Sequence, residues 1–174
     1  MIIFIAPKNS GLEKCRKIAE NFSPKKIQLI RGEDIPLFLD SIIRRGKKAI
    51  GITGEDLFKE FQLNYPDCKI KIIERIQWDD KSAKFNKPVL CLLGPNGKSL
   101  DEMPKRVKVC INKKYSRLSK KFLSILQYSH GMTFEKIYLS GATEEAFEHK
   151  MCDLVIDIVY SGESDIVILG GKND

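Results

Sequence analysis

The sequence predicts an α/β protein made of two similar lobes with mainly parallel sheets, and two observations indicate this fold class. Short apolar runs rich in β-branched residues alternate with amphipathic segments along the 174 residues, as in parallel sheets covered by helices. The same alternation occurs before and after a polar stretch at residues 79–87, without any repeat of the sequence itself. We therefore expect one α/β lobe at residues 1–84 and a second at residues 85–174.

The first lobe is expected to open with a strand at residues 2–6. This apolar run is short, lacks a basic flank and meets Pro7-Lys8 at once, unlike a signal peptide. Residues 34–45 are predicted to be helical because apolar side chains recur near helical spacing and Gly46 follows as a stop signal. The remaining expected strands are residues 26–30, 49–52 and 70–76, and the remaining helices are residues 12–21 and 55–61.

The second lobe shows the same order of signals. Its strongest strand is expected at residues 154–160, where a nearly continuous β-branched run is typical of a strand buried on both faces. A Gly-Pro-Asn-Gly turn at residues 94–97 is expected to end the first strand of this lobe. The other expected strands are residues 89–93, 107–111 and 134–139, and the helices are residues 115–128 and 143–150.

The composition argues against several classes of protein. No apolar run approaches the roughly 18 residues that a membrane span needs. The two histidines, His130 and His149, each stand alone, so the sequence indicates neither a zinc site nor a Ser-His-Asp triad. The five cysteines form no Cys-x-x-Cys pair, and we interpret them as small thiols, mostly buried, in a reducing cytoplasm.

The net charge is +7, and many of the basic residues lie between positions 105 and 121. A solvated helix face, attraction of phosphorylated ligands and nucleic-acid binding remain open as explanations. No sequence motif for reading nucleic acid accompanies the charge, so nucleic acid is the weakest of the three.

The strand expected at residues 154–160 carries the most informative chemistry. Asp153 and Asp157 are four residues apart, and this spacing puts two strand residues on one face. A hydroxyl- and glycine-containing loop follows at once, and such a loop can offer backbone N–H groups to a phosphate. The loop residues are Ser161, Gly162, Glu163 and Ser164. An acid that pairs only within the protein, followed by an ordinary turn, is the alternative.

This stretch resembles the phosphoribosyl pyrophosphate loop of the ATP phosphoribosyltransferase family, which has acid-x-x-x-acid, three residues and then Thr-Gly-x-Thr. Serines replace both threonines here and keep the hydroxyls. Residues 31–36 and 51–56 match two further family landmarks, Arg-x-x-Asp-Ile-Pro and Gly-Ile-Thr-Gly-x-Asp. Lys114-Tyr115 with Leu118 fits the family's Lys-Tyr-Pro-x-Leu, with Ser116 in place of the Pro. The four motifs occur in the family's order along most of the chain.

The resemblance implies two lobes like those of type II periplasmic binding proteins, with a ligand cleft between them. It also implies transfer of phosphoribose to N1 of ATP, with Mg2+ bound to the pyrophosphate of the second substrate. Asp153 and Asp157 would be the catalytic pair at the ribose hydroxyls, and residues 161–164 would wrap the 5-phosphate. The ATP and pyrophosphate side would be formed by residues that follow the first three strands, namely Lys8, Arg31, Thr53 and Gly54.

The resemblance further implies a homo-oligomer and, for short members of the family, a regulatory subunit resembling histidyl-tRNA synthetase. The rival interpretation is a non-catalytic two-lobed module that binds a phosphorylated nucleoside or another anion. Two departures favour the rival. Pro7-Lys8 is followed by Asn9-Ser10 where the family has Gly-Arg, and the chain ends soon after Ser164.

Overall fold

The computed structural model divides into two compact units, Met1–Arg75 and Ile76–Asp174. The boundary expected from the sequence, after residue 84, lies later in the chain than this division. The structure describes residues 2–8, 17–24, 26–76, 81–160 and 166–168.

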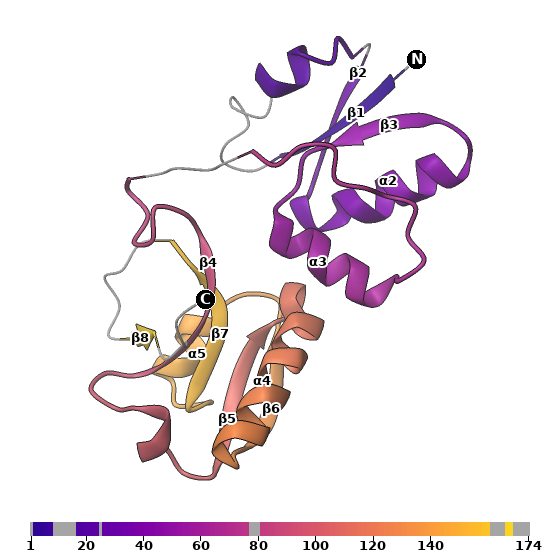
Figure 1. Ribbon diagram of the computed structural model, residues 1–174. Helices are drawn as coiled ribbons and strands as arrows, with labels where there is room; N and C mark the ends of the chain where they lie inside the picture. The colour runs from indigo at the N-terminus through magenta and orange to yellow at the C-terminus, as the bar shows by residue number, and fades with distance from the viewer. Residues whose placement is uncertain (1, 9–16, 25, 77–80, 161–165, 169–174) are drawn as a thin grey trace. The chain divides into compact units, whose positions relative to one another are not determined.

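The first unit is built on a parallel three-stranded sheet (Figure 1). Its strands are β1 (Ile2–Pro7), β2 (Lys26–Ile30) and β3 (Lys48–Gly51), in the order β2-β1-β3. A 3-10 turn, η1 (Gly32–Asp34), leads into helix α2 (Ile35–Arg44), and helix α3 (Glu55–Asn64) follows β3.

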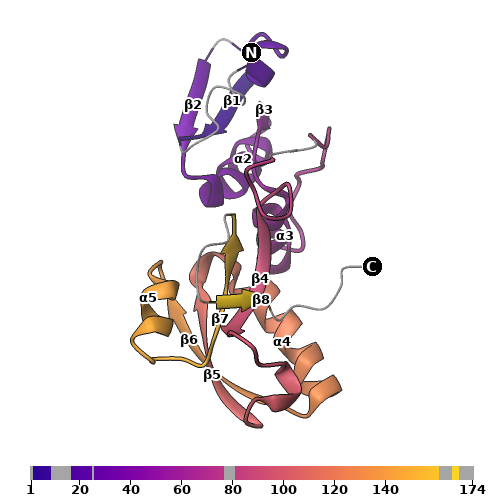
Figure 2. The same cartoon turned by 90° about the vertical axis from the view of Figure 1, so that its left-hand side faces the viewer.

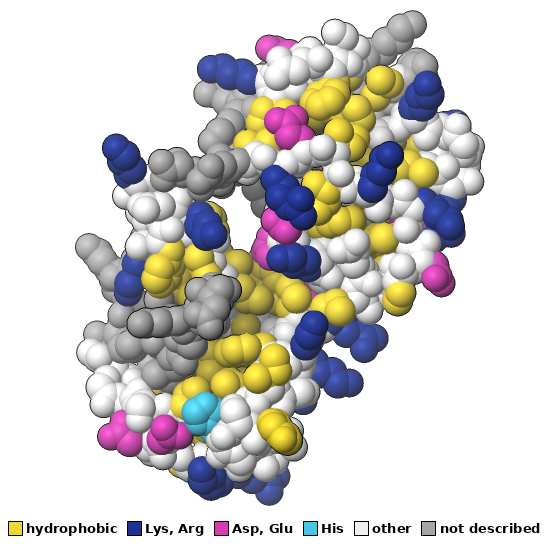
Figure 3. All heavy atoms as spheres, in the orientation of Figure 1, with side chains coloured by type: hydrophobic (Ala, Val, Ile, Leu, Met, Phe, Trp, Pro, Cys, Tyr) yellow, Lys and Arg dark blue, Asp and Glu magenta, His cyan; other side chains and the backbone are white. Residues whose placement is uncertain are grey.

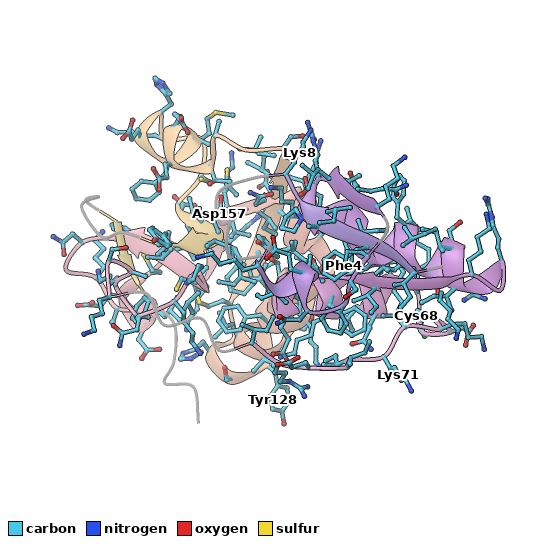
Figure 4. All side chains as sticks on the ribbon, turned by 90° about the horizontal axis from the view of Figure 1, so that it is seen from above. Phe4, Lys8, Cys68, Lys71, Tyr128 and Asp157 are labelled. Carbon is cyan, nitrogen blue, oxygen red and sulfur yellow. The ribbon has the colours of Figure 1, made fainter. Side chains whose placement is uncertain are left out.

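The central strand β1 is buried on both faces because apolar layers cover each side of it. Phe4 lies in the interior (Figure 4) in a cluster with Ala6 and Ala19, while Ile5 points to the other face and packs against Ile35 and Leu39 of α2. Gly51 allows α2 to lie this close to β3. A Cβ atom at Gly51 would come within 2.6 Å of Leu39 Cδ1 and 2.9 Å of Ile35 Cγ2.

The strand expected at residues 70–76 is a wrong prediction, because this segment forms no strand in the structure. Ile70 packs beside the Ile5 cluster, whereas Ile72 and Ile73 are 41% and 66% exposed. An alternating pattern becomes a strand only when a neighbouring strand completes its hydrogen bonds. Among the described residues of this unit, only β1, β2 and β3 pair with one another.

A buried carboxylate ties helix α2 to the segment that follows α3. Asp40 Oδ1 accepts a hydrogen bond from the Lys69 backbone N–H at 2.6 Å, and Asp40 Oδ2 accepts one from Arg44 Nε at 2.5 Å. Arg44 Nη2 donates in turn to the Asp67 carbonyl at 2.8 Å. Burial alone would raise the pKa of Asp40, but the hydrogen bonds and charge of Arg44 and the Lys69 N–H lower it below its ordinary value of 3.8.

We expect the contacts of Asp40 with Arg44 and the Lys69 N–H to make the stability of the first unit depend on pH in the acid range. A carboxyl group whose pKa is lower in the folded state stabilises the fold fully above its unfolded pKa. That contribution is lost as the pH falls below 3.8 and through the lowered pKa of Asp40. Chemical denaturation of wild type and Asp40→Asn between about pH 2 and about pH 7 brackets the pKa of about 4 for an ordinary Asp. The free energy of unfolding should fall less at acid pH in the variant than in wild type. Equal acid losses in both proteins would contradict a linkage at Asp40.

The second unit is built on a five-stranded mixed sheet in the order β6-β5-β7-β4-β8. Three adjacent strands are parallel, and β4 runs antiparallel to both β7 and β8. The strands are β4 (Val89–Pro95), β5 (Arg106–Asn112), β6 (Thr133–Leu139), β7 (Leu154–Val159) and β8 (Ile166–Ile168). The helices are α4 (Ser116–His130) and α5 (Thr143–Glu148), with 3-10 turns η2 (Leu100–Glu102) and η3 (Lys113–Tyr115).

The two helices of this unit cover opposite faces of its sheet (Figure 2). Leu123 and Leu126 of α4 pack on one face, and Ala146 of α5 packs on the other. Because successive strand residues point to opposite faces, β7 sends Ile156 to the α4 side and Val155 to the α5 side. The predicted α/β architecture with mainly parallel sheets is confirmed. In the part of the chain that the structure describes, no helix is long and apolar enough to cross a membrane.

Three cysteines lie buried in the α5-side cluster of the second unit: Cys91, Cys110 and Cys152. Burial raises the pKa of Cys91, and burial together with the neighbouring Cys110 thiol raises the pKa of Cys152 to about 12. The thiolate is the reactive form, so these groups are expected to be inert at neutral pH.

Labelling of the folded protein should therefore distinguish the cysteines by their rates of reaction. In a Cys15→Ser background, the partly exposed Cys68 should react with a disulfide reagent at once, and the three buried thiols should react only on unfolding. A Cys68→Ser variant in the same background controls the assignment of the fast thiol. Rapid reaction of more than one thiol in the folded protein would contradict the burial of this cluster.

Candidate functional site

The second unit places a polar cluster at the carboxyl ends of its parallel strands, centred on Asp157 of β7 (Figure 4). Asp157 Oδ2 accepts a hydrogen bond from Thr143 Oγ1 at 2.5 Å. Asp157 Oδ1 accepts one from the Ile158 backbone N–H at 2.7 Å. Asn112 Nδ2 lies 3.3 Å from both carboxylate oxygens. Ligands of open α/β sheets bind at this edge, so Asp157 is positioned beside a candidate site.

The topology brings these three residues together from distant parts of the sequence. Strands β5 and β7 are parallel neighbours with Ile111 opposite Ile156, so the next residues, Asn112 and Asp157, lie side by side. Thr143 is the first residue of α5, which begins after β6 and packs against both of these strands. Ala142 turns the chain into this helix with a left-handed backbone, at φ 54°.

The members of this cluster differ in how deeply they are buried. Thr143 and Asn112 are 3% and 9% exposed, whereas the Asp157 side chain is only partly buried. Buried polar groups are stable when they are hydrogen-bonded, and both neighbours meet this need through Asp157. The carboxylate is therefore held by hydrogen bonds from two buried neighbours.

Asp153, the other acid of the predicted catalytic pair, lies at the opposite end of the strand. It precedes β7, is exposed, and its Oδ2 accepts a hydrogen bond from the Lys108 backbone N–H at 2.7 Å. Four residues of strand separate Asp153 and Asp157 by roughly 13 Å, at about 3.3 Å per residue. The geometry thus favours Asp157 as the acid beside a ligand and gives Asp153 a capping contact. The predicted phosphate loop, Ser161, Gly162, Glu163 and Ser164, lies outside the described residues.

In the first unit, the residues predicted to face ATP and pyrophosphate come together at one edge of the sheet. Lys8 follows β1, Arg31 follows β2, and both are exposed. The Lys8 backbone N–H donates to the Ile30 carbonyl at 2.8 Å and ties the ends of these two strands together. Thr53 Oγ1 donates to the Gly32 carbonyl at 3.0 Å and ties the loop after β3 to the loop after β2.

Gly54 forms the entrance to helix α3 at this same edge. It is the N-cap residue of α3, has extended backbone angles and is exposed. A Cβ atom there would lie 2.3 Å from Asp56 Oδ1, because the Asp56 side chain folds back towards the start of the helix. Lys8, Arg31, Thr53 and Gly54 therefore share one edge of the three-stranded sheet, and two cations are available there to an anionic ligand.

The basic residues are not confined to that edge. On the face shown in Figure 3, Lys and Arg side chains are spread over the surface and do not gather in one patch. Among the described residues, no group of three or more His, Cys, Asp or Glu side chains is arranged to hold a metal ion.

Sequence reasoning missed Asn112 and placed Thr143 only at the start of an expected helix. Asn112 ends a buried strand, which is where polar residues of parallel sheets reach the ligand edge, so its position was a usable signal. The contact from Thr143 to Asp157 spans fourteen positions and depends on how α5 crosses back over the sheet. No local pattern in the sequence encodes that crossing.

The family model and one solved structure that match this chain carry the same family description. Residues 31–164 match the family model described as HisG, ATP phosphoribosyltransferase. The ATP phosphoribosyl transferase (HisG:HisZ) complex from Thermotoga maritima superposes with a TM-score of 0.65 and 20% identity, over 98% of this chain and 82% of that chain. The alkanesulfonate-binding protein SsuA from Xanthomonas axonopodis pv. citri, solved with MOPS bound, gives 0.56 and 15%, over 97% of this chain and 60% of that chain.

The two structural matches confirm the predicted two-lobed fold of the type II periplasmic-binding-protein kind. No curated protein sequence matches the chain. The family model spans well over half of the residues and includes Arg31, Thr53, Asn112, Thr143 and Asp157. This chain belongs to the ATP phosphoribosyltransferase family.

Proposed function

We propose that the protein joins N1 of ATP to C1 of phosphoribosyl pyrophosphate and releases pyrophosphate, the first step of histidine biosynthesis. The observation that carries this proposal is the family match over residues 31–164, within which Asp157 lies at the ligand edge of its sheet. The work of such a protein is to bind and orient two anionic substrates and to stabilise developing charge.

In the proposed reaction the C1–O bond to pyrophosphate breaks and its electron pair leaves with the pyrophosphate. The N1 lone pair of ATP forms the new bond to C1. Positive charge develops on the ribose between these events, and a carboxylate fixed beside the hydroxyls stabilises it more strongly than a neutral group does. Asp157 has this role in the proposal, while residues 161–164 hold the 5-phosphate. Lys8 and Arg31, with Thr53 and Gly54, meet the anionic groups on the other substrate side.

In the proposed reaction, Mg2+ would bind together with the phosphoribosyl pyrophosphate substrate. Protein sites for Mg2+ commonly use one or two carboxylates together with the phosphates of a substrate. The described residues place the Asp157 carboxylate at the ligand edge of the second unit, and no group of three or more His, Cys, Asp or Glu side chains among them is arranged to hold a metal ion. This donor set fits a metal ion that is bound mainly by the substrate.

The remaining parts of the proposal follow from the family. A homo-oligomer in the cytoplasm, with a HisZ-like regulatory subunit resembling histidyl-tRNA synthetase, would be its working form. The HisG:HisZ complex provides the precedent for such a partner. The second candidate is a non-catalytic module that binds a phosphorylated nucleoside or another anion, and the Asn9-Ser10 pair after Lys8 favours it.

Calorimetric titration with Mg2+ and phosphoribosyl pyrophosphate, followed by an assay for phosphoribosyl-ATP, tests the two candidates. Binding with ATP-dependent product formation, by the chain alone or with a HisZ-like subunit added, would support the transferase. Binding without product under both conditions would leave the anion-binding module. Absence of binding would overturn both.

A further inference from the structure

The hydrogen bonds around Asp157 fill every acceptor position of its carboxylate. An ionised carboxyl group has about four such positions, two on each oxygen. Oδ1 receives the Ile158 N–H and the Asn112 amide, while Oδ2 receives the Thr143 hydroxyl and the same amide. A ribose diol that binds this carboxylate must therefore replace a donor that is already present.

The four contacts differ in strength, and the difference identifies the donor that yields. The contacts from Thr143 and Ile158 measure 2.5 Å and 2.7 Å, which are short for bonds to a charged acceptor. The two contacts from Asn112 both measure 3.3 Å, beyond the usual range for N–H···O bonds. One amide shared between two oxygens at that distance is the weakest of the set.

The position of each donor supports the same division. The Ile158 N–H belongs to the backbone that adjoins Asp157, so it cannot leave without breaking the strand. Thr143 is 3% exposed at the start of α5 and is fixed by the packing of that helix. Asn112 Oδ1 accepts from the Lys114 N–H at 3.2 Å, which directs the amide nitrogen of Asn112 towards the carboxylate.

We propose that Thr143 is a positioning residue that fixes the Asp157 carboxylate for a ribose diol, and that the diol binds by displacing the Asn112 amide. This inference rests on the proposed function and specifies which group of the substrate Asp157 recognises. Thr143 acts through Asp157 and touches no substrate atom. In the absence of the sugar, the Asn112 amide donates to the Asp157 oxygens at the position where the two hydroxyls would bind.

The test compares ribose 5-phosphate with 2-deoxyribose 5-phosphate, which lacks one of the two hydroxyls, by calorimetry. Wild type should prefer the ribose compound. Thr143→Val keeps the shape of the side chain but removes the hydroxyl, and should reduce this preference about tenfold, equivalent to about 1.4 kcal/mol. Thr143→Ser keeps the hydroxyl and should restore the preference. Asn112→Ala should bind ribose 5-phosphate at least as tightly as wild type.

Thr133→Val is the matched control, because Thr133 is exposed at the opposite end of β6 and the change is identical. It should leave the affinities for both sugar phosphates unchanged. If Thr143→Val does not fold, Thr143→Ala and Thr143→Ser carry the same comparison.

Three results would overturn the inference. Equal weakening towards both sugars in Thr143→Val, without rescue by serine, would show that Thr143 only supports the fold. Weakening in Asn112→Ala as large as in Thr143→Val would show that the amide does not yield to the diol. If wild type binds neither sugar phosphate nor phosphoribosyl pyrophosphate, the proposed function fails and this inference fails with it, which the first two results would not imply.

Discussion

Asp157→Asn is expected to lower the rate of phosphoribosyl-ATP formation by about 10²–10³-fold, the range seen when one fixed electrostatic contact to a transition state is removed. The substitution removes the negative charge beside the ribose, where positive charge develops in the proposed reaction. It also turns one acceptor into an amide NH₂ that faces the donors around it. Those donors are the Thr143 hydroxyl, the Ile158 N–H and the Asn112 amide.

The donor clash gives the variant a second expected property. An amide donor that faces other donors loses hydrogen bonds, so the melting temperature of Asp157→Asn should fall although the protein still folds. Steady-state rates at a temperature where circular dichroism shows a folded variant separate the two effects. Asp153→Asn, the same change at the exposed acid that caps the Lys108 N–H, provides the comparison. A larger loss of rate at position 153 than at position 157 would reverse the assignment of the two acids.

The division between these two acids shows where sequence reasoning reached its limit. The spacing of Asp153 and Asp157 predicts that both acids lie on one strand, whereas Asp153 immediately precedes β7 and only Asp157 lies within it. The spacing also cannot tell which end of the strand faces the ligand. That end is set by the direction of β7 relative to its parallel neighbour β5 and by the polar residues that converge there. The resemblance of the motif predicts a site beside this strand, and the topology favours Asp157 as its acid.

The elements that the sequence predicted well are those whose burial is decided locally. The run over Leu154–Val159 is buried on both faces, and its β-branched composition already indicates this. Helix α2 likewise follows from its apolar spacing and from the glycine after it. Both patterns contain enough information within about ten residues to determine the element.

Elements that depend on pairing with a distant segment were predicted less well from the sequence. The sequence at residues 70–76 alternates like a strand, yet among the described residues no neighbouring strand completes its backbone hydrogen bonds. The antiparallel direction of β4 and the short strand β8 depend on pairings between residues far apart in the chain. Hydrophobic patterns record which side of a segment is buried but not which segment it pairs with.

The largest gain in activity is expected from restoring a basic residue at the end of β1. The ATP phosphoribosyltransferase family has Pro-Lys-Gly-Arg at this point, and the present chain has Pro7, Lys8, Asn9 and Ser10. Lys8 follows the carboxyl end of β1. Asn9 and Ser10 lie outside the described residues. We expect the chain alone to form phosphoribosyl-ATP slowly, and the double variant Asn9→Gly/Ser10→Arg to be about 10²–10³-fold faster.

The physical reason is the charge that appears on pyrophosphate as the C1–O bond breaks. A guanidinium that meets this charge stabilises the transition state more than the bound substrate, so kcat should rise while the affinity for phosphoribosyl pyrophosphate changes much less. Ser129→Arg adds the same charge on an exposed position of α4 and should leave kcat unchanged. Rapid turnover by the wild-type chain, or an equal gain from the change at position 129, would show that no contact is missing at the end of β1. A gain confined to the β1 variant would mean that the chain retains the rest of a transferase site and lacks one cation for pyrophosphate departure.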